Sequence, residues 1–378
     1  MNDQQEGDGP GGPPTQLADS RPQLDQPLRV TIPVNAPMRA IRASQDEYIQ
    51  KNAFSPMALS ATKSALPELL GVGKGNSEES KGGSAKGGDN GSAAVAGTQT
   101  AIADFSTLAF SSKRSGKKDK EAIAYVSLGV IYDNQGNQQK AIENYQLYAD
   151  LSDEMGDSAG VSCAYNCLGV DYMLMACPPS DTGFVGDGSV VRTKEQLTYL
   201  DKAVACHQRH VEIGPDQGGR FVANTNLGIS LGMRGDVSAA AKCHQDALRI
   251  AIKMQTLYGQ SIAVGNLGML ALAKNDLPTS RTCFEQHLQL VQALLDPEAE
   301  INAWKLLAKL CGREENFADA MENLSQAAKI AVHNGMLNEL RRINCLIGMA
   351  QGQLGFAGQT DALLAALQAR EEVARAAC

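Results

Sequence analysis

The sequence predicts an all-α solenoid of about six helix-turn-helix repeats over residues 118–378, preceded by a mostly disordered arm over residues 1–117. Three observations predict this fold class. The chain repeats itself with a period of 40 residues. Each period contains two apolar stretches at helical spacing, separated by turn residues. A small residue recurs at one position on each stretch, which lets two antiparallel helices approach closely.

The arm differs from the rest of the chain in composition. Residues 1–120 hold nine of the fourteen prolines, and their charges nearly cancel, with fourteen Lys and Arg against thirteen Asp and Glu. Residues 71–97 are rich in Gly, Ser and Lys, so they bury too little apolar area to offset the entropy of ordering and should form a flexible tether. The amphipathic segment Phe54–Leu70 could lie in the protein's own groove, and Ile102–Phe110 is expected to cover the exposed face of the first repeat.

A Leu-Gly pair marks the first helix of each predicted repeat. The spacings between successive pairs are 40, 59, 40, 40 and 40 residues. A second small residue follows twelve residues after the glycine position, except in the second repeat, where Ala203 follows after 34. The pairs are Leu128-Gly129, Leu168-Gly169, Leu227-Gly228, Leu267-Gly268, Leu307-Ala308 and Ile347-Gly348.

The irregular spacing places an insertion in the second repeat, at about residues 177–198. Loops of this length are usually functional or disordered. Because Phe184, Val185, Val190 and Val191 make it less polar than a tether, we expect the insertion to fold over an end of the groove or to contact a partner.

The repeat resembles the tetratricopeptide repeat family. Aromatic residues stand where that family favours them, four before the glycine, three after it, and on the second helix. The 40-residue form is similar to Leu-Gly-Asn repeat adaptors, kinesin light chains and axonemal repeat proteins. The resemblance implies a right-handed superhelix whose first helices line a concave groove that takes a peptide or a helix from a partner. The residues that carry the resemblance are Tyr125, Tyr165, Trp304, Tyr132, Tyr172, Tyr145 and Phe284, with His207 and His244 replacing the aromatic in two repeats.

Eight side chains are predicted to line this groove. Asn226 and Asn266 lie two residues before the glycine and Asn166 three before it, and an asparagine can both donate to and accept from a ligand's main chain. An alternative role for these asparagines is to cap or satisfy neighbouring backbone. The residues that follow the glycine position would supply apolar pockets ending in a charge: Val130, Val170, Ile229, Met269 and Lys309.

No sequence motif indicates catalysis, a cofactor or a metal site. The G-x-S-x-G and H-E-x-x-H patterns are absent. Cys206-His207 and Cys243-His244 occupy equivalent positions of successive repeats, a repeat width apart, which is too far to share one zinc ion. Cys163 and Cys167 share a helix face, but two ligands do not make a closed site. We therefore expect a protein that is not an enzyme.

Charge and hydropathy limit the classes of partner. The formal net charge is −8, and residues 121–378 carry 20 basic against 29 acidic side chains, which argues against nucleic-acid binding. No apolar run reaches the roughly 18 residues of a membrane span, and the first residues lack signal-peptide features, so a cytoplasmic location without membrane insertion is expected. The leading hypothesis is an adaptor or scaffold for other proteins. The alternative is a structural component of a cytoskeletal or ciliary, axonemal complex anchored by the arm.

Overall fold

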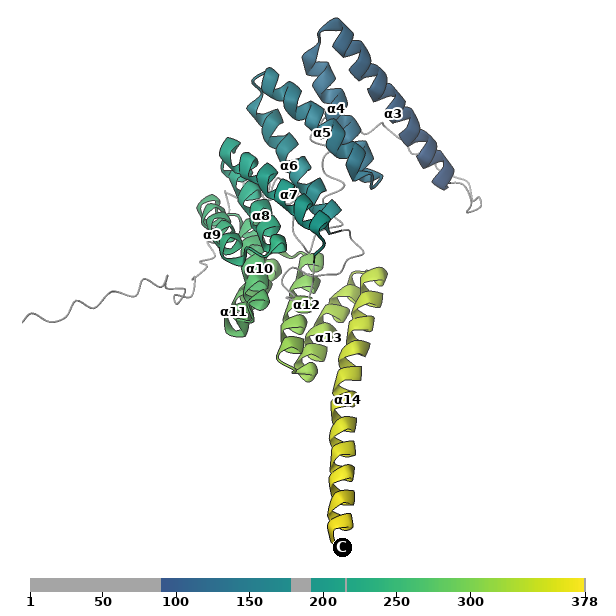
Figure 1. Cartoon of the computed structure of the whole chain (residues 1–378), viewed down its shortest axis with the longest axis vertical. Coiled ribbons are helices and arrows are strands. Elements are labelled where there is room, and N and C mark those ends of the chain that lie inside the picture. Colours follow the sequence, from purple (N-terminus) through teal and green to yellow (C-terminus); the bar gives the residue numbers. More distant parts are fainter. Residues whose placement is uncertain (1–89, 178–191, 215, 377–378) are drawn as a thin grey trace, which may run out of the picture. The chain divides into compact units, whose positions relative to one another are not determined.

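A computed structural model describes residues 90–177, 192–214 and 216–376, and in this part of the chain the regular structure is entirely helical (Figure 1). Each described helix packs against the next, and short turns join them except between α6 and α7, where residues 177–193 intervene. They are α3 (Asn90–Ser115), α4 (Lys118–Asn134), α5 (Gln138–Glu154), α6 (Ser158–Ala176), α7 (Lys194–Ile213), α8 (Gln217–Arg234), α9 (Val237–Met254), α10 (Leu257–Ala273), α11 (Leu277–Leu294), α12 (Pro297–Arg313), α13 (Phe317–His333) and α14 (Leu337–Ala376).

The predicted all-α repeat is confirmed in α4 to α13, which form five helical hairpins. In four of them, a side chain of the second helix lies directly against the glycine of the first. A methyl group added at Gly129 would lie 2.5 Å from Cε1 of Tyr145, and one added at Gly268 would lie 2.7 Å from Cδ1 of Phe284. Small residues therefore recur because the facing side chain fills the space that a Cβ atom would need.

The turns within four of the five hairpins share one backbone geometry, and the exception is the α6–α7 hairpin that contains the insertion. At the end of the first helix, a residue of positive φ is followed by a residue whose N–H donates to the carbonyl five residues back, as Asn316 N does to Cys311 O at 2.9 Å. The next helix begins on an Asn or Asp, and three of the four side chains accept a bond from a backbone N–H of the first turn. These capping residues are Asn137, Asp236, Asp276 and Asn316, of which Asp236 lacks the side-chain bond.

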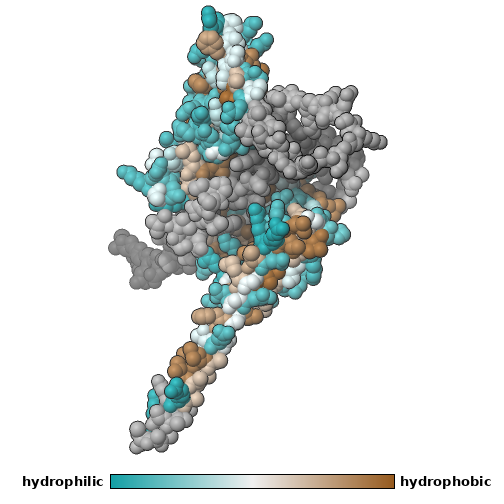
Figure 2. Space-filling model, turned by 90° about the vertical axis from the view of Figure 1, so that its right-hand side faces the viewer, coloured by the Kyte–Doolittle hydropathy of each residue, from teal (hydrophilic) through white to brown (hydrophobic). Residues whose placement is uncertain are grey.

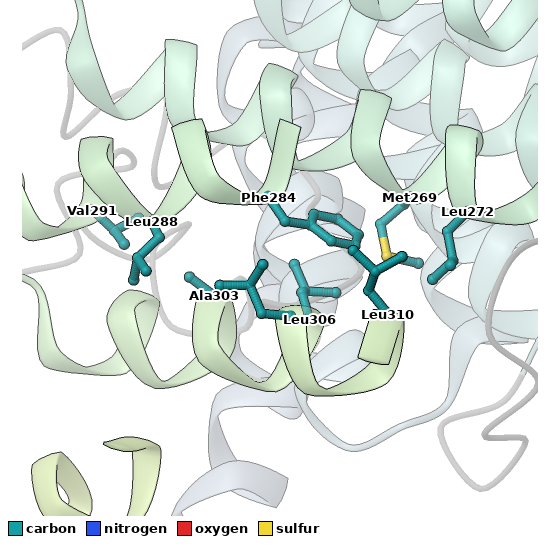
Figure 3. Close-up of a cluster of buried hydrophobic side chains, with 9 residues drawn as sticks. Met269, Leu272, Phe284, Leu288, Val291, Ala303, Leu306 and Leu310 are labelled. Carbon is teal, nitrogen blue, oxygen red and sulfur yellow. The ribbon is translucent and has the colours of Figure 1, made fainter. Parts of the chain in front are cut away.

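The core runs between successive hairpins. Phe284 on α11 is fully buried between Met269 of α10 and Leu306 and Leu310 of α12 (Figure 3). Each hairpin thus closes its apolar face only when the next one stacks on it, as expected for a repeat array.

Three details differ from the expectation. The last predicted hairpin is one continuous helix, α14, whose second half extends past α13 without a helix beside it (Figure 1). The segment Ile102–Phe110 belongs to α3, which packs against the first helix of the first repeat, α4, as expected, but α3 begins at Asn90, inside the expected tether. The helix α7 begins at Lys194 because Thr193 and Gln196 form a capping box, so the predicted insertion at 177–198 includes the first turn of α7. The segment Phe54–Leu70 and the apolar residues of the insertion lie outside the described residues.

Candidate protein-binding groove

A groove of about 710 Å³ lies between α12, α13 and the first half of α14. We call it the C-terminal groove. Its surface is mostly apolar, with a few polar side chains from α12 and α14. The residues that line it include Leu306 and Lys309 of α12, Phe317 and Leu324 of α13, and Leu346 and Met349 of α14.

Local sequence signals hold the three walls in place. Asp296 caps α12 by accepting from Glu298 N at 3.0 Å and Ala299 N at 3.1 Å, and Asn316 caps α13. Ile343 is fully buried against α13 and fixes the first half of α14 there. The groove is therefore a gap between packed helices and does not depend on loops.

Charged groups stand on the α12 wall. Lys305 Nζ lies 2.5 Å from Oε1 of Glu339 on α14 and 3.2 Å from Oδ1 of Asn302. Both members of this ion pair are mostly buried, so the pair links α12 to α14 across one end of the groove. Lys309, one helical turn further along α12, is half-buried and lines the same groove. The apolar surface thus carries ammonium groups on one side.

Only one of the eight residues predicted from the sequence lines this groove. Lys309 does so, whereas Val130, Ile229 and Met269 are buried in contacts between helices and Val170 is half-buried beside Ile229. These apolar residues pack against neighbouring hairpins of the array.

Two of the three predicted asparagines are in contact with each other. Asn226 is fully buried, and its Nδ2 donates to Oδ1 of Asn166 at 2.8 Å, so a hydrogen bond joins α8 to α6. Asn266 is also buried, and its Nδ2 has no hydrogen-bond partner among the described residues. The structure therefore places Asn226 between helices, where its amide satisfies a neighbouring asparagine.

The residues that α14 contributes to the groove were not among those predicted from the sequence. Leu346, Met349 and Gln353 lie 40 residues after Leu306, Lys309 and Arg313. Met349 also follows Gly348, so it extends the series of positions that gave Lys309. The repeat pattern pointed to Met349, but the predicted series of groove residues ended one repeat earlier, at Lys309.

The buried histidines serve packing. A methyl group at Gly169 would lie 2.4 Å from His207, and one at Gly228 would lie 2.6 Å from His244. Burial lowers the pKa of His207 to about 3, with a smaller contribution from His210, and burial alone lowers the pKa of His244 to about 3. Both rings are therefore neutral at pH 7. Within the described ranges, no group of three or more His, Cys, Asp or Glu could hold a metal ion.

No protein-family model matches the chain. No curated protein matches it either. Among solved structures, BtubC (BKLC) from P. vanneervenii is 17% identical, with a TM-score of 0.49, over 63% of this chain and 92% of that one.

Two further solved structures are similar over part of their length. A signal transduction ATPase with a tetratricopeptide repeat sensor from Pyrococcus horikoshii is 16% identical with a TM-score of 0.46, and the match covers 61% of this chain and 33% of that one. The Cut9-Hcn1 assembly of the APC/C is 14% identical with a TM-score of 0.33, over 67% of this chain and 47% of that one. At such low identity and TM-score, the assignment to helical repeats depends on the chain's own hairpins. Among the described helices, each is too short or too polar to span a lipid bilayer.

Proposed function

We propose that the protein is a non-enzymatic scaffold that binds a segment of another protein in the C-terminal groove. The observation that carries the proposal is the groove itself, an open cavity of about 710 Å³ with apolar walls from three packed helices. Its volume falls within the roughly 300 to 1,000 Å³ of ligand sites, and its lining runs from Asn302 to Gly312 along α12, where an amphipathic helix or an extended segment could lie.

The charges on the α12 wall favour one kind of segment. Lys309 places its ammonium group beside the apolar surface of the groove, where a partner's carboxylate is attracted more strongly than it would be in bulk water. The charge of Lys305 is balanced by Glu339. We therefore expect a partner segment with apolar side chains at helical spacing and an Asp or Glu close to them.

Two finer hypotheses remain predictions. A ligand-binding role for Asn166 and Asn266 would require side chains on α6 and α10 to be reached by a partner, and Asn226 would act by holding Asn166. Attachment to a cytoskeletal or ciliary assembly depends on the arm, and residues 1–89 lie outside the described part of the chain.

Photocrosslinking tests the groove directly. Benzoylphenylalanine would replace Gln353, which lines the groove, or Lys329, which is exposed on α13 and does not line it. Each full-length variant is irradiated in extract of cells that express the protein, and the products are identified by mass spectrometry. We expect protein adducts from position 353 that are not formed from position 329.

Charge reversal provides the matched control. Lys309→Glu should reduce the adducts at position 353 at least several-fold, because it places a carboxylate on the α12 wall. Lys329→Glu makes the same charge change on α13 and should leave them unaltered. Identical adduct patterns from both positions, or equal effects of both reversals, would count against binding in this groove.

A further inference from the structure

The backbone of the array has a period that α14 interrupts. Residues of positive φ end successive helices at intervals of 20 residues, first through Gly116 to Gly156 and again from Gly235 to Gly335. The next position in this series is Gly355. Glycine suits a positive φ better than any other residue, yet Gly355 lies inside α14 without one. The sequence thus retains the turn residue of a sixth hairpin.

The contact that closes each hairpin is missing in α14. Gly348 is the counterpart of Gly268, and Leu364, at 40 residues after Leu324, is the counterpart of Phe284. Apart from its chain neighbours and the nearby backbone of its own helix, no described atom lies within 4 Å of the place that a Cβ atom of Gly348 would occupy. Leu364 is 52% exposed. Both sides of a contact that closes the earlier hairpins are therefore open.

Other positions of α14 show the same difference. Met349 is 68% exposed, whereas Met269, two repeats earlier, is 5% exposed and packs with the second helix of its own hairpin. Figure 2 shows hydrophobic surface along the helix that projects at the lower end of the view. The exposed apolar side chains of α14 beyond residue 345 are Leu346, Met349, Leu354, Phe356, Leu363, Leu364 and Leu367.

The residue after Gly355 cannot cap a new helix, which favours a continuous helix through this position. In the turns before α5, α9, α11 and α13, an Asn or Asp directly follows the residue of positive φ. In α14 the residue that follows Gly355 is Phe356. An apolar residue in place of Asn or Asp at this position costs about 1 kcal/mol of helix initiation, so the turn is disfavoured relative to a continuous helix. With α14 straight, its own second half cannot reach its first half.

We propose that two copies of this chain exchange the second half of α14, residues 357–376, so that each copy completes the sixth hairpin of the other. The two α14 helices would run antiparallel, with Leu364 of one copy against Gly348 of the other. Such an exchange is self-complementary, as a twofold dimer requires. A second copy is the occupant that the sequence favours, because the missing contact has both of its halves in this chain. The proposal goes beyond the C-terminal groove but shares Leu346 and Met349 with it, so an exchanged helix and a bound partner segment would compete for that part of α14.

Disulfide trapping tests the exchange. In α10 and α11, Gly265 faces His287, whose Nδ1 would lie 3.4 Å from a methyl group on the glycine. The corresponding positions, 80 residues later, are Cys345, which is exposed, and Leu367. One copy would carry Leu367→Cys with Cys345→Ser, and a second, of different tagged mass, would keep Cys345 and Leu367. Both would carry Cys378→Ser. A disulfide that joins position 367 to Cys345 can then form only between copies.

We expect the mixed sample to form a covalent heterodimer on oxidation, identified by non-reducing electrophoresis and by the linked peptide. The control is Ala365→Cys in place of Leu367→Cys, on the other face of the helix, which should not form the same product. Full-length chain is used throughout, and circular dichroism checks that each variant retains its helix content.

Two results would overturn the proposal. One is an internal disulfide in a chain that carries both Cys345 and Leu367→Cys, without heterodimer, since it would show that the segment folds back on its own copy. The other is no disulfide between these positions in either arrangement. As a second measurement, Gly348→Leu fills a place that is open in the single chain. It should raise the dimer dissociation constant at least about tenfold in sedimentation experiments without lowering the melting temperature of the monomer.

Discussion

Adding one methyl group to Gly268 should destabilise the array, although alanine is the better helix former. Its Cβ atom would lie 2.7 Å from Cδ1 and Cε1 of Phe284 and 2.9 Å from Cβ of Cys283. The phenyl ring is fully buried and is enclosed by Met269 and Leu310, among others (Figure 3), so it has little room to move.

The size of the effect follows from two opposing contributions. Overpacking a filled core costs about 1 to 3 kcal/mol, whereas replacing Gly by Ala inside a helix gains about 1 kcal/mol. Since the ring of Phe284 has little room to move, we expect the cost to outweigh the gain for Gly268→Ala, with a net loss of up to about 2 kcal/mol in the free energy of unfolding. Gly348→Ala makes the same chemical change at an open position and should be neutral or should stabilise by up to about 1 kcal/mol.

The fifth hairpin supplies a compensating change. There Ala308 occupies the glycine position and Leu324 the aromatic position, and both are buried. Phe284→Leu alone should cost about 1 to 2 kcal/mol through the cavity that it leaves. Combined with Gly268→Ala, it should cost less than the sum of the two single changes by at least about 1 kcal/mol.

Urea unfolding followed by fluorescence measures this coupling. The chain has one tryptophan, Trp304, and it packs against the cluster that contains Phe284. Because repeat arrays can unfold in parts, the fluorescence transition is compared with circular dichroism at 222 nm before free energies are extracted. If the double variant lost as much stability as the two single variants together, within about 0.5 kcal/mol, the contact between residues 268 and 284 would not explain the small residue.

Two further changes test buried polar groups. His207 and His244 have a pKa of about 3 when folded, against 6.5 when unfolded, so the unfolded state binds more protons below about pH 6.5. The contribution of each neutral histidine to the free energy of unfolding is fully present above that pH and should fall by roughly 2 to 3 kcal/mol by pH 4.5. His244→Phe should therefore make the melting temperature less dependent on pH. An unchanged pH dependence would contradict this. Asn226→Ala should lower the free energy of unfolding by about 1 to 3 kcal/mol because it leaves Asn166 without the 2.8 Å bond. Asn224→Ala, at a more exposed site, should cost below about 0.5 kcal/mol by thermal melting. Equal losses in the two variants would argue against the buried bond.

The period of the sequence predicted the hairpins because their packing is repeated. A glycine that faces a bulky side chain recurs only if the same two helices meet in the same way each time, so Gly129 and Gly268 located the contacts correctly. The capping box of Thr193 and Gln196 marks the start of α7 by a local rule of the same kind, although it was not used when the insertion was placed at 177–198. Local rules of this kind depend on residues close in sequence.

The faces of the first helices were harder to predict. On α10, buried side chains surround the helix, so an apolar position such as Met269 gives no indication of which side meets solvent. Burial of Asn226 depends on α6, sixty residues earlier in the chain, and its bond to Asn166 has no signal in the repeat. The sequence could locate these residues within the repeat, but only contacts between distant helices determine what each one touches.

The residue at the middle of α14 connects the missing turn to the proposed dimer. In the exchanged arrangement, position 348 faces 364 and position 345 faces 367, and both pairs sum to 712. Position 356 therefore faces itself across the twofold axis, and Phe356 stands there, 68% exposed in the single chain. The residue that removes the cap thus also supplies an aromatic contact at the centre of the dimer.

Phe356→Asn should reverse both effects. Asparagine at this position restores the cap found at Asn316 and removes the central aromatic pair, so Gly355 can form the turn within one chain. We expect a monomer by light scattering, with an internal disulfide between Cys345 and a cysteine at position 367 in place of the heterodimer. Phe356→Leu keeps an apolar side chain without a cap and should remain dimeric. A Phe356→Asn variant that still crosslinks between copies would show that the missing cap does not decide between a hairpin within one chain and an exchange between two. A monomeric Phe356→Leu variant would show that the aromatic contact alone holds the two copies together.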